Sequence, residues 1–355
     1  MQIDRTLINA SGLGATQDQE LGFGNVFSDH MLVRDWAHGE WGRAAITPRE
    51  PISVEPSALG IHYGQSVFEG LKAYRGSHDG VIRLFRPDRN AARLEASSER
   101  LCIPTLPAEE FIECIRQLVA TDAAWVPKER EHALYVRPMV FASEGHLAVR
   151  PARSYKLVIT TAPVAPYFSS RSRALRLKAE SRFTRAASGG TGSAKTSGNY
   201  APTLWPMASA AEEGFDQILW LDAQEHAFAE EAGQMNIFFR IGDEVVTPEL
   251  SGTILPGVTR ESALKLLESW GIKATTRRVS MMELVKASEE GSLLEIFGAG
   301  TAAVIASVTS ISHLGKEISA APDASGSLAE RLREELLGIQ YGERPDPHNW
   351  IQVVS

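Results

Sequence analysis

The chain is poor in cysteine. It has two, Cys102 and Cys114, among 355 residues, and they are not spaced as C-x-x-C. A disulfide scaffold, a zinc knuckle or an iron–sulfur site needs more cysteines or that spacing, so we expect none of them. The nine histidines show no H-x-x-x-H or similar ligand spacing, so we assign them no metal role. The scarcity of thiols fits a reducing compartment.

Long hydrophobic runs and excess positive charge are also missing. No stretch approaches the ~20 apolar residues of a membrane span. Asp4 and Arg5 lie where a secretory signal would need an apolar run. The 36 basic and 44 acidic side chains give a formal net charge of −8, which disfavours a broad basic surface for nucleic acid or anionic lipid. We therefore expect a cytoplasmic, soluble protein that acts on small molecules, with neither a nucleic-acid nor a membrane partner.

What the chain does have is ordinary globular composition and the length of two domains. A stretch from Pro163 to about Arg173 has two prolines and neither helical nor strand periodicity, which favours a linker. We predict a smaller N-terminal α/β domain over 1–165, an interdomain linker over 166–178, and a larger C-terminal domain over 179–355. The candidate reactive lysine described below would belong to the C-terminal domain.

Short β-rich runs alternate with helical patterns, which predicts a mixed α/β or α+β scaffold. Helices are expected to begin at Pro87 and Pro107, because proline is favoured in the first turn of a helix. Ser280 and Glu283 match a capping box, which predicts a third helix start. Two more helices are expected over 259–270 and 327–339. Strands are expected over 31–33 and 44–46, as a hairpin, and over 81–85, 134–136, 156–159, 217–221 and 236–241.

The Gly/Ser-rich segment 187–200 contains the candidate reactive residue, Lys195. The segment lacks the G-x-x-x-x-G-K-[ST] spacing of a nucleoside-triphosphate loop, because Lys195 follows Ala194. Small residues let a backbone approach a flat cofactor, and a lysine in apolar surroundings becomes an amine nucleophile suited to Schiff-base chemistry. The alternative is a mobile surface loop with a solvated lysine, which is the usual environment of lysine.

Segments around this lysine carry a resemblance to a known family. Three segments resemble the fold-type IV pyridoxal-phosphate enzymes: 192–203 (GSAKTSGNYAPT), 230–236 (EEAGQMN) and 255–260 (LPGVTR). Others resemble the branched-chain amino acid aminotransferases within that group: 63–74 (YGQSVFEGLKAY), 83–93 (RLFRPDRNAAR), 135–138 (YVRP), 297–302 (FGAGTA) and 340–342 (QYG). The resemblance extends from about Phe23 to Tyr341. It implies a two-domain fold-type IV fold like that of D-amino-acid aminotransferase.

The resemblance also implies how pyridoxal 5′-phosphate would be held. Lys195 would form a Schiff base with the cofactor and would later move the proton between the substrate Cα and the cofactor. Glu231 would pair with the pyridine nitrogen, and Tyr200 would hydrogen-bond the ring hydroxyl oxygen. The phosphate would be bound by the guanidinium of one arginine, two amides at a helix start and one hydroxyl. These groups belong to Arg93, Val258, Thr259 and Thr301.

A substrate site is implied in the same way. An aromatic lining suited to a branched aliphatic side chain would consist of Phe23, Phe68, Tyr135 and Tyr167. Tyr63 and the amides of Thr301 and Ala302 would hold the substrate α-carboxylate. Arg137 would bind the distal carboxylate of glutamate or 2-oxoglutarate, which a branched-chain substrate lacks. In the family, a loop matching the one around Val149 reaches the neighbouring subunit's site, so the resemblance implies a homodimer.

Two positions depart from the family pattern. Animal enzymes of the family have a C-x-x-C redox pair where this chain has Ala303 and Ala306, which excludes that thiol switch. Those enzymes have threonine where this chain has Gln234, a longer amide expected near the pocket. The departure at Gln234 bears on side-chain preference and leaves the reaction type unchanged.

The sequence therefore predicts a pyridoxal-phosphate aminotransferase. Its substrates would be leucine, isoleucine or valine, with 2-oxoglutarate as amino acceptor and glutamate as product. One alternative is another fold-type IV enzyme, either a D-amino-acid aminotransferase or an aminodeoxychorismate lyase, although residues 135–137 argue against it. A second alternative is a catalytically silent cofactor-binding homologue, which Lys195 and Glu231 disfavour. Substrate profiling distinguishes the first alternative from a branched-chain aminotransferase. Bound cofactor without turnover would support the second alternative.

Overall fold

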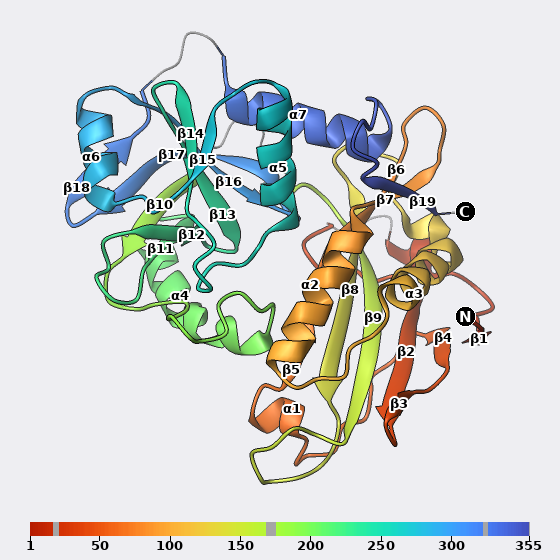
Figure 1. The fold of residues 1–355 in the computed structure, drawn as a ribbon. Coiled ribbons are helices and arrows are strands. Elements are labelled where there is room, and N and C mark those ends of the chain that lie inside the picture. The colour runs from red at the N-terminus through yellow and green to blue at the C-terminus, as the bar shows by residue number, and fades with distance from the viewer. Residues whose placement is uncertain (17–20, 168–174, 322–325, 355) are drawn as a thin grey trace. The chain divides into compact units, whose positions relative to one another are not determined.

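The computed structural model describes residues 1–16, 21–167, 175–321 and 326–354, and these form two compact units (Figure 1). Each unit contains a β-sheet with its own hydrophobic core. The first unit comprises Met1–Tyr167, Ala194–Gly198 and Leu337–Ser355. The second comprises Phe168–Ser193 and Asn199–Leu336. The mixture of helices and strands confirms the α/β class expected from the sequence.

Ten strands of the described chain make the sheet of the first unit, in the order β1-β4-β2-β9-β8-β6-β7-β19, with β3 beside β2 and β5 beside β8. Their bounds are β1 Ile3–Arg5, β2 His30–Ala37, β3 Glu40–Trp41, β4 Ala44–Pro48, β5 Ser66–Phe68, β6 Leu71–Arg75, β7 Ile82–Phe85, β8 Ala133–Ala142, β9 Ser154–Val164 and β19 Ile351–Val354. Side chains alternate between the two faces of a strand. Along β8, Leu134 and Val136 therefore enter the hydrophobic core, whereas Tyr135 and Arg137 share the opposite face.

Two helices cover the core face of this sheet, α2 (Pro87–Arg100) and α3 (Ala108–Thr121) (Figure 1). Apolar residues of α3 at helical spacing, such as Phe111, Ile115 and Leu118, are buried in the core. Pro87 is the first residue of α2, as its sequence position predicts. The shorter helical elements of this unit are α1 (Leu59–His62) and the 3₁₀ turns η1 (Gly12–Thr16) and η2 (Ala123–Trp125).

In the second unit, nine strands of the described chain follow the order β12-β11-β10-β17-β16-β13-β14-β15, with β18 beside β17. An additional pairing of β12 with β13 closes part of this sheet on itself. The bounds are β10 Leu175–Glu180, β11 Gln217–Leu221, β12 Ala229–Ala232, β13 Met235–Ile241, β14 Glu244–Thr247, β15 Ala274–Thr276, β16 Leu293–Gly300, β17 Val304–His313 and β18 Lys316–Ser319.

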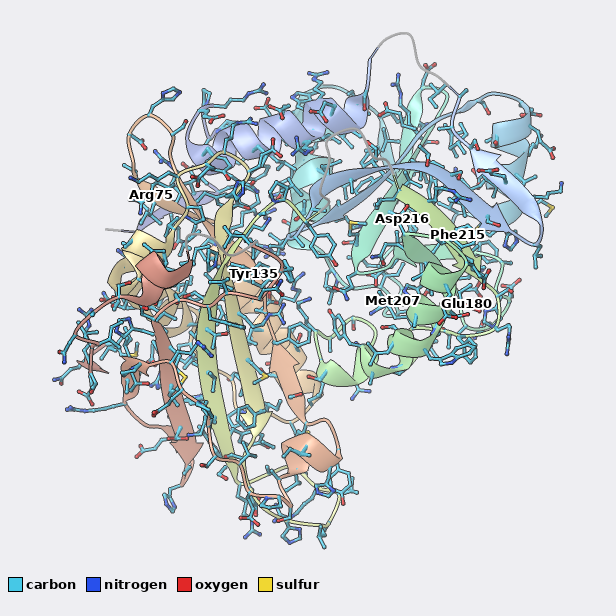
Figure 2. All side chains as sticks on the ribbon, turned by 180° about the vertical axis from the view of Figure 1, so that it is seen from behind. Arg75, Tyr135, Glu180, Met207, Phe215 and Asp216 are labelled. Atoms are coloured by element: carbon cyan, nitrogen blue, oxygen red, sulfur yellow. The ribbon has the colours of Figure 1, made fainter. Side chains whose placement is uncertain are left out.

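Helices of the second unit pack on this sheet through alternating apolar residues. Trp220 on β11 faces α4 (Leu204–Glu212) with Met207 and Phe215 beside it (Figure 2), whereas Leu219 enters the main core. The other helical elements are the 3₁₀ turns η3 (Ser197–Asn199), which spans the two units, and η4 (Ala201–Thr203), with α5 (Val258–Ser269), α6 (Met281–Glu289) and α7 (Leu328–Tyr341). No helix of the described ranges has the length and apolar character needed to cross a bilayer.

Each element expected from the sequence is confirmed within a few residues. The predicted hairpin corresponds to β2 and β4, with the short β3 on its connection. The capping box is present at α6, where the Ser280 side chain accepts a 3.0 Å hydrogen bond from the Glu283 amide.

The predicted domain boundaries differ from the structure in three places. Residues 168–174 of the predicted linker lie outside the described residues, and 175–178 belong to strand β10. Lys195 groups with the first unit, because its segment is bonded to β5. The C-terminal residues from Leu337 onward also group with the first unit, since the final strand β19 pairs with β7.

Candidate active site

The loop that carries Lys195 is held on both sides by the first unit. The Lys195 amide donates to Ser97 Oγ on α2 (2.9 Å), and the Lys195 carbonyl accepts from the Phe68 amide on β5 (3.0 Å). The next residue, Thr196, bridges to Val67 and donates its hydroxyl to the Ser66 carbonyl (2.8 Å). These bonds fix the lysine backbone, which argues against a mobile loop, and the Lys195 side chain is half-buried.

The amine of Lys195 lies in a desolvated and charged environment. Burial lowers the pKa of Lys195 to about 8, with Arg93 and Arg137 acting in the same direction and Glu69 and Tyr135 opposing them. At pH 7 roughly a tenth of the amine is therefore neutral, against less than about a thousandth for a lysine at its ordinary pKa. This side chain can act as a nucleophile or a base near neutral pH.

Arg93 on α2 lies near the Lys195 amine and pairs with the buried carboxylate of Glu69. Its Nε and Nη2 donate to the two oxygens of Glu69 at 2.7 and 2.9 Å. Asn90, one turn earlier, donates to the same carboxylate (2.7 Å). Because side chains at i, i+3 and i+7 share one face of a helix, Asn90, Arg93 and Ser97 all point toward Glu69 and the Lys195 loop.

Aromatic side chains gather around the same charges. The Lys195 amine lies 4.8 Å from the centre of the Phe68 ring, and the Arg137 guanidinium lies 5.0 Å from it. On β8 (Figure 2), the Tyr135 hydroxyl accepts from Arg137 (3.1 Å). The Arg137 Nε is buried without a hydrogen-bond partner among the described residues. A buried donor of this kind marks a place for an incoming acceptor such as a carboxylate.

Phe23 and Tyr167 extend this aromatic cluster. The Phe23 ring packs edge-on against Tyr135 and Tyr167, with centroids 4.7 and 5.2 Å away. Burial raises the pKa of Tyr167, with nearby Tyr135 adding to the effect. The four aromatic residues expected to line the substrate site, Phe23, Phe68, Tyr135 and Tyr167, are thus brought together.

Tyr63 does not join that cluster. Its side chain is exposed, its hydroxyl donates to the Leu147 carbonyl, and its ring contacts His62. Val149, on the same loop as Leu147, is 81% exposed. In one chain, therefore, Tyr63 and Val149 belong to an exposed loop region.

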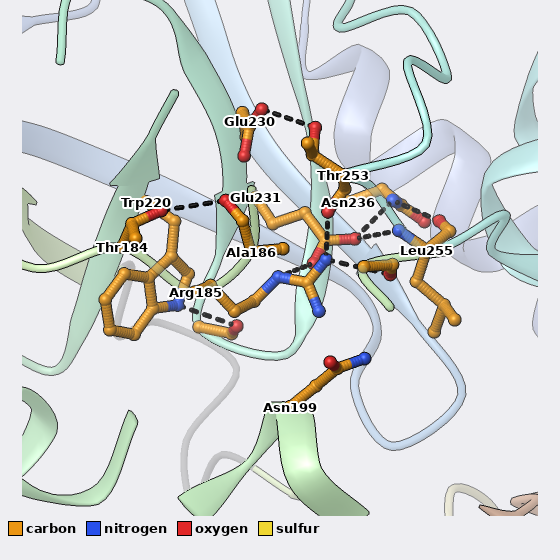
Figure 3. Close-up of polar contacts among 12 residues, drawn as sticks. Thr184, Arg185, Ala186, Asn199, Trp220, Glu230, Glu231, Asn236, Thr253 and Leu255 are labelled. Carbon is orange, nitrogen blue, oxygen red and sulfur yellow. Dashed lines mark hydrogen bonds and ion pairs between the residues drawn. The ribbon is translucent and has the colours of Figure 1, made fainter. Parts of the chain in front are cut away.

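The second unit contains a separate buried cluster around Glu231 on β12 (Figure 3). One oxygen of Glu231 accepts from the Leu255 amide (2.9 Å) and from the side-chain amide of Asn236 (3.1 Å). The other oxygen lies 2.8 Å from Arg185 Nε, close enough for an ion pair, although the N–H direction is too poor for a hydrogen bond. These contacts hold both carboxylate oxygens of Glu231 in a fixed orientation.

Glu230, the neighbouring residue, is on the opposite face of β12. It accepts from the Thr253 hydroxyl at 2.5 Å and lines a pocket of about 190 Å³. Burial raises the pKa of Glu230, against the hydrogen bond from Thr253 and the charge of Arg185. Two adjacent glutamates therefore have different surroundings, as expected for alternating positions on a strand.

The expected phosphate-binding amides lie at the first turn of α5, whose N-cap is Gly257. A Cβ on Gly257 would lie 2.0 Å from Asn236 Oδ1, so only glycine permits this close approach. Asn236 also pairs with Ala299 on β16, which ends at Gly300, immediately before Thr301 and Ala302. Asn236 thereby links Glu231, the start of α5 (Val258 and Thr259) and the end of β16.

Tyr200 and Gln234 lie in turns of the second unit. Tyr200 precedes η4 and follows Asn199, whose side chain is bonded to Thr191 (2.6 and 2.7 Å). Gln234 is exposed in a two-residue turn between β12 and β13, where Gly233 adopts a φ of +59°. Glycine at the first position of such a turn is expected, because that position requires a positive φ.

A model of the family described as "Amino-transferase class IV" matches residues 66–311 of this chain. The chain is 44% identical over 337 residues to "Branched-chain-amino-acid aminotransferase 2" of Bacillus subtilis, covering 95% of this chain and 93% of that protein. It is 46% identical over 339 residues to "Branched-chain-amino-acid aminotransferase" of Mycobacterium tuberculosis, covering 94% and 92%. The chain belongs to the branched-chain amino acid aminotransferase family.

Solved structures of branched-chain aminotransferases have the same fold. The Escherichia coli enzyme superposes with a TM-score of 0.74 at 25% identity, covering 91% of this chain and 99% of that one. The Thermobaculum terrenum enzyme, solved in its PLP form, gives 0.75 at 21% identity, covering 93% and 99%. These likenesses confirm the expected fold-type IV fold. These relatives give no support to the two alternative activities, D-amino-acid aminotransferase and aminodeoxychorismate lyase.

Three polar residues of the aminotransferase were not among the residues predicted from sequence. Glu69 and Asn236 lie within the matching segments 63–74 and 230–236, so a charged or amide residue between apolar neighbours was an available signal. Arg185 lies outside every matching segment. Its partner Glu231 is 46 positions away, and its other contacts, to the carbonyls of Gly192 and Thr253, involve backbone groups that leave no mark in sequence.

Proposed function

We propose that this chain transfers the amino group of leucine, isoleucine or valine to 2-oxoglutarate, with pyridoxal 5′-phosphate as cofactor. The products are the branched-chain 2-oxo acids and glutamate. The observation that carries this proposal is the half-buried Lys195 amine, whose backbone is fixed on β5 and α2, beside Arg93, Arg137 and an aromatic wall. An aminotransferase needs such an amine and two places for anions, and these residues supply both.

The residues present fit the cofactor. Lys195 supplies an amine that is partly neutral near pH 7, which an aldehyde requires. Arg93 supplies a planar fork for a phosphate, and the start of α5 supplies backbone amides with the positive end of a helix dipole. Glu231, buried and hydrogen-bonded, supplies a carboxylate for a protonated ring nitrogen. We assign Thr301 to the phosphate and Tyr200 to the ring hydroxyl oxygen on the family pattern.

When bound, the cofactor supplies the electron sink that makes the substrate Cα proton acidic. Lys195 then acts as the general base and acid that removes and returns this proton, and its lowered pKa places it near the working pH. Glu231 would keep its partner nitrogen protonated, and Arg185 places a positive charge 2.8 Å from the other carboxylate oxygen. The residues of the chain thus divide into one that moves protons and others that hold charge in place.

One pocket must accept a branched alkyl chain and a second carboxylate in turn. Phe23, Phe68, Tyr135 and Tyr167 suit the alkyl chain because an aromatic wall disfavours an unpaired charge. Arg137 stands on that wall with a buried Nε that has no partner among the described residues, which suits the distal carboxylate of glutamate. Tyr63 and the amides of Thr301 and Ala302 are assigned to the α-carboxylate.

We also propose a homodimer. Ile61, Leu147 and Val149 are apolar and strongly exposed in one chain, and Tyr63 donates to Leu147 within the same region. A loop with such side chains is suited to cover part of a neighbouring chain. For the location, both cysteines are free thiols, which fits the cytoplasm.

The test is a panel of amino donors and 2-oxo acid acceptors on purified protein, read together with its visible spectrum. We expect a yellow protein that transfers amino groups from leucine, isoleucine and valine to 2-oxoglutarate. A colourless protein that cannot be reloaded with pyridoxal 5′-phosphate would refute the cofactor assignment. Turnover of D-alanine without turnover of the branched-chain L-amino acids would refute the substrate assignment.

A further inference from the structure

Glu69 is a fully buried carboxylate for which the proposed function has so far given no role. It lies in the turn between β5 and β6 and is 0% exposed. Its oxygens accept from Arg93 Nε and Nη2 at 2.7 and 2.9 Å, from Asn90 at 2.7 Å, and from the Gly70 amide at 3.1 Å. Four donors therefore hold one carboxylate in a single orientation.

A buried ion pair is in general weak evidence for a role in fold stability. Replacing a buried ion pair with well-packed apolar residues is often neutral or stabilising, because both charges must be desolvated. The surroundings are nevertheless rigidly built for Glu69. A Cβ on the following Gly70 would lie 1.9 Å from the Tyr135 hydroxyl, so the turn can hold only glycine beside this carboxylate. Such a costly arrangement points to a role in the site.

We propose that Glu69 is a positioning residue, which orients the Arg93 guanidinium so that its other edge faces the cofactor phosphate, and which balances the positive charge around Lys195. The inference rests on the proposed function, because it assumes that Arg93 binds the phosphate and that Lys195 carries the cofactor.

The first part of this role is geometric. A guanidinium has five N–H donors in one plane, and two of those of Arg93 are directed at Glu69. This bidentate pair fixes the guanidinium plane before any phosphate arrives, so less side-chain freedom is lost on binding. Asp at this position would keep the charge but would be one methylene too short to hold the same fork.

The second part is electrostatic. The charged and titratable groups that act on Lys195 come from three elements: Glu69 in the β5–β6 turn, Arg93 on α2, and Tyr135 and Arg137 on β8. Glu69 and Tyr135 raise the pKa of Lys195, whereas burial and the two arginines lower it. Burial works to raise the pKa of Glu69, but Arg93 and Lys195 hold it below its ordinary range, so Glu69 is ionised at neutral pH. Removing its charge would lower the lysine pKa further.

Two variants separate these parts. Glu69→Gln keeps the size and removes the charge, whereas Glu69→Asp keeps the charge and shortens the reach. The matched control is Glu283→Gln, which breaks a bidentate pair with Arg277 in the second unit (2.6 and 2.9 Å). Each full-length protein is stripped of cofactor and mixed with either pyridoxal 5′-phosphate or pyridoxal, which lacks the phosphate. The rate of capture is followed by absorbance from pH 6 to 10, and each melting temperature is recorded.

For Glu69→Gln we expect the preference for pyridoxal 5′-phosphate over pyridoxal to fall about 2- to 12-fold, the value of ordering one long side chain before binding. Its capture profile should also move to lower pH. Glu69→Asp should lose a similar part of the preference while its pH profile stays near that of the wild type. Glu283→Gln should change neither quantity.

The inference is overturned if Glu69→Gln keeps both the wild-type preference and the wild-type pH profile. If Glu69→Gln does not fold, Glu69→Asp decides alone, and an unchanged phosphate preference in that variant refutes the positioning role. A wild-type protein that captures neither probe refutes the proposed function instead. The two failures are therefore distinguishable.

Discussion

The lysine cluster of the first unit and the carboxylate cluster of the second unit differ in their charge balance. Around Lys195 there are three basic side chains, Lys195, Arg93 and Arg137, and one paired carboxylate, Glu69. Around Glu231 two carboxylates, Glu231 and Glu230, face two guanidinium groups, Arg185 and Arg260. Amides donate to one oxygen of Glu231. The first cluster is short of negative charge, whereas the second is close to neutral.

This difference indicates what each cluster does. A desolvated group of positive charges attracts anions, and the proposed reaction brings a phosphate and two kinds of carboxylate. A nearly neutral group whose carboxylate accepts two amide hydrogen bonds is suited to hold that carboxylate in one orientation. On the proposed function, the lysine cluster would bind anions and react, and the carboxylate cluster would set the electronic state of the cofactor.

Removing the amine from the lysine cluster should have the largest effect. We expect Lys195→Ala to abolish turnover and the visible absorption of the lysine-bound cofactor, because no other lysine lies in a segment that matches the attachment site. Some cofactor should still bind through Arg93 and the α5 amides. Lys178→Ala, which removes an outer lysine paired with Glu213, is the control. Normal turnover by Lys195→Ala would mean that the attachment site has been misread.

Neutralising the carboxylate cluster should reduce the rate far more than the cofactor occupancy. Glu231→Gln cannot keep the ring nitrogen protonated. We therefore expect turnover per bound cofactor to fall by about 100-fold or more, the usual loss when a residue that controls a proton in the reaction is removed. Occupancy is measured by absorbance, and turnover by product formation. Glu230→Gln, one position away on the other face of β12, should retain most activity. If occupancy of Glu231→Gln collapses while the rate per bound cofactor is unchanged, Glu231 is structural.

Arg137 should distinguish the two amino donors. A hydrogen bond to a charged group contributes about 1.5 to 3 kcal/mol, so Arg137→Met should lower kcat/KM of the glutamate half-reaction roughly 10- to 150-fold. The leucine half-reaction should change much less, since leucine has no distal carboxylate. Single-turnover spectra of each half-reaction measure both values. Equal losses for leucine and glutamate would show that Arg137 supports the β8 surface and does not select substrate.

The pH dependence of cofactor capture tests the lysine environment alone. Only the neutral amine reacts, and burial lowers the pKa of Lys195 to about 8. The capture rate of stripped protein should therefore rise about tenfold per pH unit below pH 8 and level off above it. A rate that keeps rising beyond pH 9 would mean that the amine is solvated and has the pKa of an ordinary lysine.

Local sequence patterns predicted most of the fold, because helix periodicity, proline at a helix start and the capping box act within a few residues. The units were harder to assign. The pairing of β19 with β7 joins residues more than 250 positions apart, and a four-residue strand gives no sign of its partner. For the same reason the sequence placed Lys195 with the C-terminal domain, although hydrogen bonds to β5 and α2 group it with the first unit.

The candidate site was predictable where the family pattern marks individual residues. That pattern identified Lys195, Arg93 and Arg137, and their contacts in the structure place them in one cluster. It did not identify the partners that set their charge. Glu69 meets Arg93 across 24 positions, and Arg185 meets Glu231 across 46, through pairs that form only when strands and helices pack. Charge pairing is a tertiary property, so spacing in sequence gives no access to it.

Chemical mapping of the cofactor attachment tests whether Lys195 is the residue that binds pyridoxal 5′-phosphate. The purified protein is loaded with pyridoxal 5′-phosphate, reduced with borohydride to make the lysine linkage permanent, digested and analysed by mass spectrometry. We expect the added mass on Lys195 and no added mass in the Lys195→Ala variant. Stoichiometric labelling of a different lysine, or no label in a protein that transfers amino groups, would contradict it.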